Sequence, residues 1–495
     1  MVLRDAGSCE KFFRGEFSMP SWMYFVIALA GLLGGYFVYG AIVEKVFGPD
    51  PNRPTPACKM PDGVDYVEMS PAKVFLIQLL NIAGLGPVFG PILGALYGPV
   101  ALLWVVIGCV FAGGVHDYFS GMLSVRYNGK SVPDIVGYNL GDVIKKLMRV
   151  FAVVLLVLVG VVFVAGPAGL MSHLTGMDGM IFVAIIFAYY FLATVLPVDK
   201  IIGRIYPFFA VLLVFMAVGL LSALIFKGYT FYNNIEWTTQ SPAGLPVWPL
   251  VFITIACGAC SGFHATQSPL MARCISNEKH GRAIFYGAMI AEGVIGLIWV
   301  TLGMSFYPDT AALAAALGPK GNAALVVNNI SVELLGTFGG ALAVLGVVVL
   351  PVTSGDTAFR AARLTIADAL GFDQRPHKNR LLLAVPLVMV GIALNFIPFG
   401  MLWRYFGFAN QALAAIVLWS AAAYLMHRGK FHWIASIPAM FMTAVSSVYI
   451  CYEKTMGFGM SYEMANIVGI SITVICFILL VTVGRKIQPS DDMNA

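Results

Sequence analysis

The sequence predicts an all-α polytopic membrane protein of about thirteen transmembrane helices, with a core of two inverted five-helix repeats. Three observations support this prediction: a low content of charge, a succession of long apolar stretches, and two stretches interrupted by glycine and proline. Of 495 residues, 59% are hydrophobic and 11% are charged, and the mean hydropathy is +0.85. A soluble domain carries about 25% charged residues, so this composition indicates a chain that lies in a bilayer.

The apolar stretches predict the helices one by one, because a bilayer core requires about 20 apolar residues per helix. They cover residues 22–44, 73–96, 98–122, 149–172, 180–197, 205–226, 248–272, 283–306, 333–355, 381–398, 400–426, 432–451 and 466–484. We expect loops in the longest polar connections, at 48–71, 123–148, 227–247 and 356–380, and no soluble domain. The first twenty residues are polar and precede a long apolar stretch, so we expect no cleaved signal peptide.

Two of the predicted helices are broken near their centres. The stretch at 76–96 contains Gly84, Gly86 and Pro87, and the stretch at 251–272 contains Gly258 and Gly262. Clustered glycine and proline interrupt a helix, and backbone groups freed at that depth must line a cavity or bind something. A simple kink is the alternative for either break taken alone.

Each broken stretch opens a run of five predicted helices, at 73–226 and 248–426. Because five is odd, the two runs must have opposite orientations. Interrupted helices at corresponding places in inverted halves indicate the binding site of a transporter. A lone carboxylate also follows each break at nearly the same distance, Asp117 after Gly84 and Glu292 after Gly258. We therefore divide the chain into 1–71 with one extra helix, repeats at 72–226 and 227–426, and 427–495 with two further helices.

The distribution of basic residues predicts the orientation. Most of the 30 lysines and arginines fall in connections on one side, which the positive-inside rule assigns to the cytoplasm. The two densest clusters lie at 126–149 and 360–380. We therefore expect a multi-pass protein of the cytoplasmic (inner) membrane with its N-terminus outside and its C-terminus inside.

Several stretches resemble the carbon starvation protein A (CstA) family of peptide and pyruvate transporters. They are 55–95 (TPACKMPDGVDYVEMSPAKVFLIQLLNIAGLGPVFGPILGA), 111–132 (FAGGVHDYFSGMLSVRYNGKSV), 257–293 (CGACSGFHATQSPLMARCISNEKHGRAIFYGAMIAEG), 353–371 (TSGDTAFRAARLTIADALG) and 406–415 (FGFANQALAA). They follow the family's order. The resemblance implies a LeuT-type inverted-repeat fold and import of a small carbon source, a short peptide or pyruvate, coupled to a proton or cation gradient.

The chain departs from the family pattern in two places near the breaks. The family typically carries a histidine pair where this chain has Ile77 and Gln78. After Gly-Phe-His the family continues with a stretch ending in Lys-Gln, whereas this chain has Gln267 and Pro269. Both departures affect the expected substrate, so specificity narrower than or different from peptides is an open alternative.

We expect an anionic substrate group at the breaks, because the N-termini of half-helices carry partial positive charge and free N–H groups. His264 also matches the family motif, with a satisfied core histidine as the alternative. Amides of Asn410 and Gln411 are candidates too, or they join helices. The predicted substrate-binding residues are Asn81, Gly84, Gly86, Gly258, Ser261, Gly262, Phe263, His264 and Gln267.

Coupling has two candidate sites. Charged side chains in a bilayer cost at least about 2.5 kcal/mol and mark pathways, so His116, Asp117 and Glu292 are candidates for a proton or cation relay. Alternatively, the hydroxyls of Thr353 and Ser354, with carbonyls near 81–84, offer oxygen ligands to sodium, or they bond back to their own helix. Family members are usually described as proton-driven. Asp356 is included as a relay candidate, although its spacing from Arg360 favours an ion pair at a helix end.

The sequence argues against several other functions. Cys257 and Cys260 form a C-x-x-C, but no second pair completes four zinc ligands, so we expect packing rather than a metal site or a disulfide framework. No nucleotide-binding loop, catalytic cluster or basic nucleic-acid-binding run is present. We expect no cofactor except a coupling Na⁺ or H⁺. The expected partners are a small-molecule or peptide substrate and membrane lipid, without nucleic acid, and the oligomeric state is left open. A channel and a membrane-embedded enzyme or sensor are the competing classes.

Overall fold

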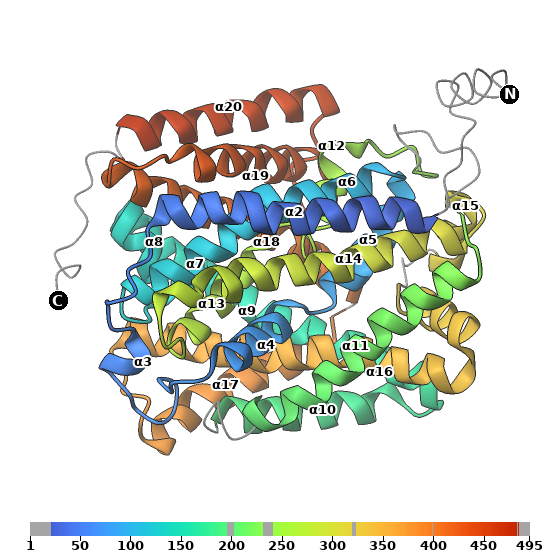
Figure 1. The fold of residues 1–495 in the computed structure, drawn as a ribbon, viewed down its shortest axis with the longest axis horizontal. Coiled ribbons are helices and arrows are strands. Elements are labelled where there is room, and N and C mark those ends of the chain that lie inside the picture. The colour runs from blue at the N-terminus through green and yellow to red at the C-terminus, as the bar shows by residue number, and fades with distance from the viewer. Residues whose placement is uncertain are drawn as a thin grey trace, which may run out of the picture.

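The computed structural model describes residues 21–195, 202–230, 241–318, 323–397, 399–482 and 484, and every element in it is a helix. The long helices run roughly side by side and form a bundle (Figure 1). The part corresponding to the first predicted repeat contains α4 (Pro71–Ile82), α5 (Gly86–Gly94), η1 (Ala95–Tyr97), α6 (Val100–Ile107), η2 (Gly108–Gly113), α7 (Gly114–Arg126), α8 (Val132–Leu140), α9 (Asp142–Thr175), α10 (Gly179–Val195) and α11 (Ile202–Phe226).

The second part also opens with two short helices separated by a break. It contains α12 (Val247–Thr254), α13 (Gly262–Ala272), η3 (Glu278–His280), η4 (Arg282–Tyr286), α14 (Gly287–Phe306), α15 (Thr310–Leu317), α16 (Ala323–Leu370), α17 (His377–Leu394) and α18 (Phe399–His427). Outside these parts lie α2 (Ser21–Phe47), α3 (Pro56–Lys59), α19 (Trp433–Tyr452) and α20 (Tyr462–Thr482). Helices α19 and α20 lie together at one edge of the bundle, next to α18 (Figure 1).

Each of the thirteen predicted stretches contains helix, but fewer are long and apolar enough to cross a membrane on their own. In the described ranges nine helices meet that test, or ten if α4 and α5, bent by 49°, count as one span. The apolar helices at Gly179–Thr194 and Val211–Phe226 are shorter, and α12 and α13 are separate short helices. The chain is therefore a multi-span membrane protein. Residues 196–197, 398 and 483 of the predicted stretches lie outside the described residues.

Three connections that we expected to be loops contain helix: one, at 48–71, holds only the short α3, and the other two hold longer helices. Residues 132–140 form α8, and α9 already begins at Asp142. Helix α16 runs on to Leu370, well beyond the predicted end of its apolar stretch at 355. The physical reason is the same in both places: these segments pack against the bundle, where Asp134, Arg360 and Arg363 are buried, so polar residues there do not mark an exposed loop. Gly336, at φ +73°, interrupts the N-terminal part of α16.

The two helix breaks have different lengths. The first break, residues 83–85, separates α4 from α5, and Pro87 in the first turn of α5 has no N–H with which to continue the helix. The second break, residues 255–261, separates α12 from α13. Within it, Gly258 has a φ of +86°, a left-handed conformation that favours glycine. Both breaks leave backbone groups without partners in their own helices.

A π-helical turn follows each break. Gly108–Gly113 and Arg282–Tyr286 are π-helical, and each leads directly into a longer helix, α7 or α14. The separation between the starts of the two turns equals the separation between Gly84 and Gly258. The two parts of the chain thus share a broken helix, a π-helical turn and a buried carboxylate in the same order.

The connections fall at two ends of the bundle. At one end Asp65 pairs with Arg360, Arg126 pairs with Glu278, and Arg273 donates to the carbonyl of Gly129. We call this the basic end. At the other end the Lys227 ammonium donates to the carbonyl of Glu333, and Tyr229 stacks on Phe306. Figure 1 shows α3 and α8 at one end and α15 at the opposite one. The two predicted basic clusters therefore lie on the same side.

Candidate functional site

The start of α5, directly after the first break, contacts the second break in the interior of the bundle. A Cβ atom on Gly86 would lie 2.1 Å from the Cβ of Cys257, and one on Gly258 would lie 3.4 Å from the Cα of Pro87. Only glycine at position 86 allows this approach, because any side chain there would overlap the second break. Gly84, also in the first break, lies against the ring of Phe163 on α9. The paired interruptions thus form one site.

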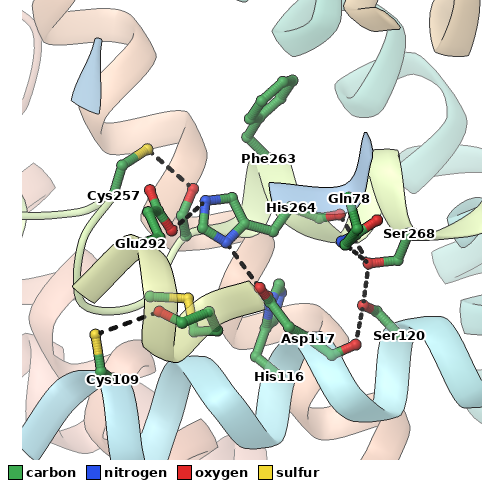
Figure 2. Close-up of polar contacts among 12 residues, drawn as sticks. Gln78, Cys109, His116, Asp117, Ser120, Cys257, Phe263, His264, Ser268 and Glu292 are labelled. Carbon is green, nitrogen blue, oxygen red and sulfur yellow. Dashed lines mark hydrogen bonds and ion pairs between the residues drawn. The ribbon is translucent and has the colours of Figure 1, made fainter. Parts of the chain in front are cut away.

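A buried cluster of two carboxylates and two imidazoles lies beside the second break. On α7, Asp117 Oδ1 is 2.7 Å from His116 Nδ1, and Asp117 Oδ2 is 2.9 Å from Nδ1 of His264 on α13. His264 Nε2 is in turn 3.3 Å from Glu292 Oε2 on α14. Figure 2 shows the His264 ring between Asp117 and Glu292. All four side chains have an exposed fraction of 0%, so their charges must compensate one another.

Side chains from three other helices bind the freed backbone groups of the second break. The Gly258 N–H donates to Glu292 Oε1 at 3.2 Å, and the Phe263 N–H donates to Asn410 Oδ1 at 2.6 Å. The Trp104 indole donates to the carbonyl of Ile255, and the Gln411 amide donates to that of Phe252. Asn410 and Gln411 therefore join α18 to the broken helix, which is one of the two roles that the sequence left open.

Hydroxyls of α16 face the first break. Thr353 Oγ1 lies 2.9 Å and Ser354 Oγ 3.0 Å from the carbonyl oxygen of Leu80, in the last turn of α4. Both hydroxyls also contact the carbonyl of Leu350 in their own helix. Neutral oxygen atoms thus meet between α4 and α16, one residue before the carbonyls at 81–84 that the sequence predicts as ligands.

Asp356 and Arg360 both have contacts with other helices. The Tyr189 hydroxyl donates to Asp356 Oδ2 at 2.5 Å, and Arg360 Nη1 lies 3.1 Å from Asp65 Oδ1. Arg363 Nη2 lies 3.6 Å from the second oxygen of Asp65. The pairing of Asp356 with Arg360 stays a prediction. Neither residue joins the His264 cluster, so the structure separates Asp356 from the other relay candidates.

The remaining candidates lie on the broken helices. Asn81 and Gln78 on α4 and Gln267 on α13 are buried, and Gln267 Nε2 donates to Thr266 Oγ1. Gln78 Nε2 lies 3.4 Å from the hydroxyl of Ser268. The two places where the chain departs from the family pattern are therefore neighbours in space, which the sequence alone does not reveal.

Ser261 and Phe263 flank the N-terminus of α13, with the Ser261 hydroxyl donating to Asn410 Oδ1. Gly262 packs so tightly that a Cβ there would lie 2.3 Å from the backbone oxygen of Asn410. A bulky residue at 262, which from the sequence alone is an obvious test of substrate binding, would therefore displace α18. Loss of transport in that variant would therefore report the displacement of α18, and it would not show that the substrate binds at Gly262.

Sequence reasoning misses three members of the site. Cys109 donates its thiol to the carbonyl of Gly258, and Ser120 bonds to Ser268, which also donates to the carbonyl of His264 (Figure 2). The apolar stretch around Cys109 predicts only a small hydrophobic residue there. A serine on the same face of α7 as Asp117, three residues on, is the one available signal for Ser120.

Three side chains could hold a metal ion. One ligand atom each from Cys257, His264 and Glu292 lies within 4.8 Å of the others, and all three side chains are buried. The seven cysteines among the described residues are unpaired.

Comparison with known proteins identifies the family. A model described as "Carbon starvation protein CstA" matches residues 20–168, 164–332 and 311–449. The chain belongs to the CstA family. It is thus a membrane transporter and not an enzyme. A membrane protein of Haemophilus influenzae is 50% identical over 61% of this chain and 95% of its own length. The protein named peptide transporter CstA in Campylobacter jejuni is 26% identical, over 90% of this chain and 82% of its own.

Solved structures show the fold of this CstA-family chain. MhsT in complex with L-phenylalanine superposes with a TM-score of 0.55, at 15% identity, over 83% of this chain and 98% of that one. A manganese transporter variant from Eremococcus coleocola gives a TM-score of 0.51 at 12% identity, over 85% of this chain and 97% of that one. Both are LeuT-type transporters, so the fold agrees with the one that the resemblance implied.

Proposed function

We propose that this chain is a secondary active transporter that imports a short peptide or pyruvate across the cytoplasmic membrane, with sodium as the coupling ion. The observation that carries the proposal is the contact of Gly86, directly after the first break, with Cys257 in the second break, inside the bundle. Interrupted helices that meet within a transporter place half-helix termini and unwound backbone where substrate and ion can bind. The name of the relatives, peptide transporter, supports the peptide alternative.

The substrate proposal rests on the polar lining of the paired breaks. Asn81, His264 and Gln267 are all buried beside them, and α13 begins at the second break with its N-terminus. A helix N-terminus favours a carboxylate, which pyruvate and peptides share. We therefore place the carboxylate of the substrate near Gly258–Gly262. The side chains of Gln78 and Ser268 are the neighbours that we expect to discriminate between substrates.

The sodium proposal rests on the oxygen cluster at the first break. Thr353 and Ser354 do more than bond back to their own helix, because each hydroxyl also lies within 3.0 Å of the Leu80 carbonyl oxygen on α4. Carbonyls of an unwound helix with hydroxyls of a neighbour are the oxygen ligands that sodium uses in such folds. An ion there would join α4 to α16. Its presence would therefore depend on the relative position of these helices.

The orientation proposal rests on the basic end. We place it in the cytoplasm, with the N-terminus outside, the C-terminus inside, and residues 72–226 and 227–426 as inverted repeats. The shared order of break, π-helical turn and carboxylate supports the repeat. Cysteine-accessibility labelling tests the orientation: reagents that cannot cross the membrane should label a cysteine at Lys145 only from the cytoplasmic side. Labelling from outside would reverse the topology.

Uptake into proteoliposomes tests the function. The parent protein should take up labelled pyruvate or a dipeptide in a saturable manner, driven by an inward sodium gradient. Non-saturable flux that ignores both the sodium and the pH gradient would indicate a channel. The double variant Thr353→Ala, Ser354→Ala should lose the sodium dependence.

The matched control removes two hydroxyls elsewhere. This control is the double variant Ser471→Ala, Thr482→Ala. In the parent, both residues are exposed and each hydroxyl donates to a carbonyl of its own helix, α20. This variant should keep parental uptake. Parental uptake that ignores sodium and collapses with the pH gradient would contradict the sodium site.

A further inference from the structure

We propose that Cys257, His264 and Glu292 form a binding site for a divalent transition metal ion, with Zn²⁺ as the expected occupant. The three ligand atoms come from the second break, α13 and α14 and lie within 4.8 Å of one another. Thiolate, imidazole and carboxylate are the ligand types that zinc takes in proteins. The inference does not depend on sodium coupling or on the identity of the transported substrate.

The separations suit a small metal ion. A tetrahedral zinc with ordinary bond lengths holds its nitrogen and oxygen ligands about 3.4 Å apart. In the structure His264 Nε2 lies 3.3 Å from Glu292 Oε2. Among the described residues, neither of these two atoms has a hydrogen-bond partner of acceptable geometry. Two unsatisfied buried atoms that face each other at the metal-ligand separation point to an ion between them.

Surrounding groups orient each ligand toward the same point. Asp117 Oδ2 lies 2.9 Å from His264 Nδ1, so it accepts the ring proton and leaves Nε2 as the metal-binding nitrogen. This carboxylate–histidine arrangement accompanies most metal-binding histidines. The Gly258 N–H binds Oε1 of Glu292, which leaves Oε2 available. The Asn410 amide N–H donates to Cys257 Sγ at 3.8 Å and orients the sulfur.

The charges also balance. A Cys257 thiolate and a Glu292 carboxylate together neutralise a divalent ion, and neutrality is important where all ligands are buried. The competing arrangement is a His264 imidazolium that bridges the two carboxylates without a metal. The two arrangements differ in one respect that can be measured: only the metal requires Cys257.

Three protein ligands leave a zinc ion with an open position, as in sites where zinc binds a water or a substrate group. The second break joins α12 to α13, and Glu292 belongs to α14, so the ion would connect the break to the next helix. We therefore expect bound zinc to stabilise the folded protein and to restrain this part of the bundle.

Metal content of the full-length protein tests the proposal. The protein is produced in zinc-supplemented medium, freed of its affinity tag, and analysed by elemental mass spectrometry. We expect about one tightly held zinc per chain in the parent, and near none in Cys257→Ser and Glu292→Gln. Asp117→Asn should weaken the affinity by about 10–100-fold, because it removes only the orienting partner.

Cys260→Ser is the matched control, because Cys260 is a buried cysteine of the same break outside the ligand set. It should hold as much zinc as the parent. No zinc in the parent, or equal zinc in Cys257→Ser, would overturn the proposal and leave His264 as the bridging cation. Should Cys257→Ser not fold, the parent loaded with Co²⁺ decides: a thiolate-to-cobalt charge-transfer band is expected, and a cobalt spectrum without it contradicts the site.

Discussion

Each break leaves backbone groups without partners in its own helix, and the two breaks differ in the side chains that bind these groups. Next to the first break, in the last turn of α4, the carbonyl of Leu80 accepts hydrogen bonds from the hydroxyls of Thr353 and Ser354, so that only neutral oxygen atoms meet there. At the second break, longer by four residues, charged and amide side chains bind both N–H and carbonyl groups, chiefly through Glu292 and Asn410. The difference teaches that one transport core can offer a neutral oxygen site for a cation and, beside it, a charged site for other chemistry.

We expect the largest effect on stability at the charged cluster beside the second break. Asp117→Asn removes a carboxylate that contacts both His116 and His264 in a fully buried cluster. Breaking a buried ion pair costs about 3–5 kcal/mol, so the variant should unfold at a clearly lower temperature than the parent. Thermal unfolding in detergent measures this. Glu463→Gln, an exposed carboxylate of α20, is the control and should change nothing. An unchanged midpoint in Asp117→Asn would contradict the buried pairing.

The next effect concerns Asp65, which ties the loop before α4 to α16 at the basic end. Burial alone would raise the pKa of Asp65, but the guanidinium groups of Arg363 and Arg360 hold it below its usual value. A depressed folded pKa stabilises the protein above the unfolded pKa of about 3.9, and this contribution is lost as the pH falls through the lower folded value.

We therefore expect Asp65→Asn to cost about 2–3 kcal/mol at neutral pH, because hydrogen bonds to charged groups are lost. The difference from the parent should shrink below about pH 4. Unfolding midpoints measured between neutral and acidic pH test both statements. Glu68→Gln, an acid in the same loop with no ion pair among the described residues, should follow the parent at every pH. A cost for Asp65→Asn that stays constant at low pH would argue against the ion pairs.

A smaller effect is expected at Asn410, which serves the second break alone. Asn410→Ala leaves the Phe263 N–H and the Ser261 hydroxyl without their shared acceptor. Loss of one acceptor from a buried donor costs about 1–2 kcal/mol. Unfolding of Asn410→Ala is compared with that of Asn52→Ala, an exposed amide. Equal stability of the two variants would mean that the second break tolerates unsatisfied backbone groups.

The smallest effect on stability should come from Gln78, which faces α13 from the first broken helix. Its 3.4 Å contact with Ser268 is long and leucine has a similar volume, so Gln78→Leu should cost at most about 1 kcal/mol. Its effect should instead be on selectivity between pyruvate and dipeptides in the uptake assay. An unchanged ratio of the two rates would remove Gln78 from the specificity determinants.

The helical class, the two breaks and their carboxylates are predictable from the sequence because each depends on local residues. Gly84 to Pro87 and Gly258 to Gly262 interrupt helices through their own backbone properties, and hydropathy locates the apolar stretches. The helical extension to Leu370 could not be predicted, since buried arginines such as Arg363 look like surface residues until their partner Asp65 is known.

Contacts between distant segments are likewise beyond local reasoning. Asp117 and Glu292 are candidates for separate reasons in the sequence, and only the fold shows that His264 lies between them. The sequence next to Cys257 offers too few metal ligands, so it predicts packing. Glu292, the third residue of the candidate metal site, lies on α14 and is distant in the sequence. The oxygen cluster at Thr353 and Ser354 is easier to predict from the sequence, because both hydroxyls lie close to Pro351 in one helix. Only the Leu80 carbonyl comes from another helix.

The π-helical turns set the angular position of the helices that they lead into. One extra residue in a helical turn rotates the downstream segment by roughly a quarter of a revolution, because a residue of α-helix occupies about 100°. Asp117 comes after Gly108–Gly113 and Glu292 after Arg282–Tyr286, each within two turns. Removing one residue from either turn would swing that carboxylate away from His264 while leaving the composition of the helix intact. The alignment of the cluster is therefore a property of chain length between break and carboxylate, repeated in both halves.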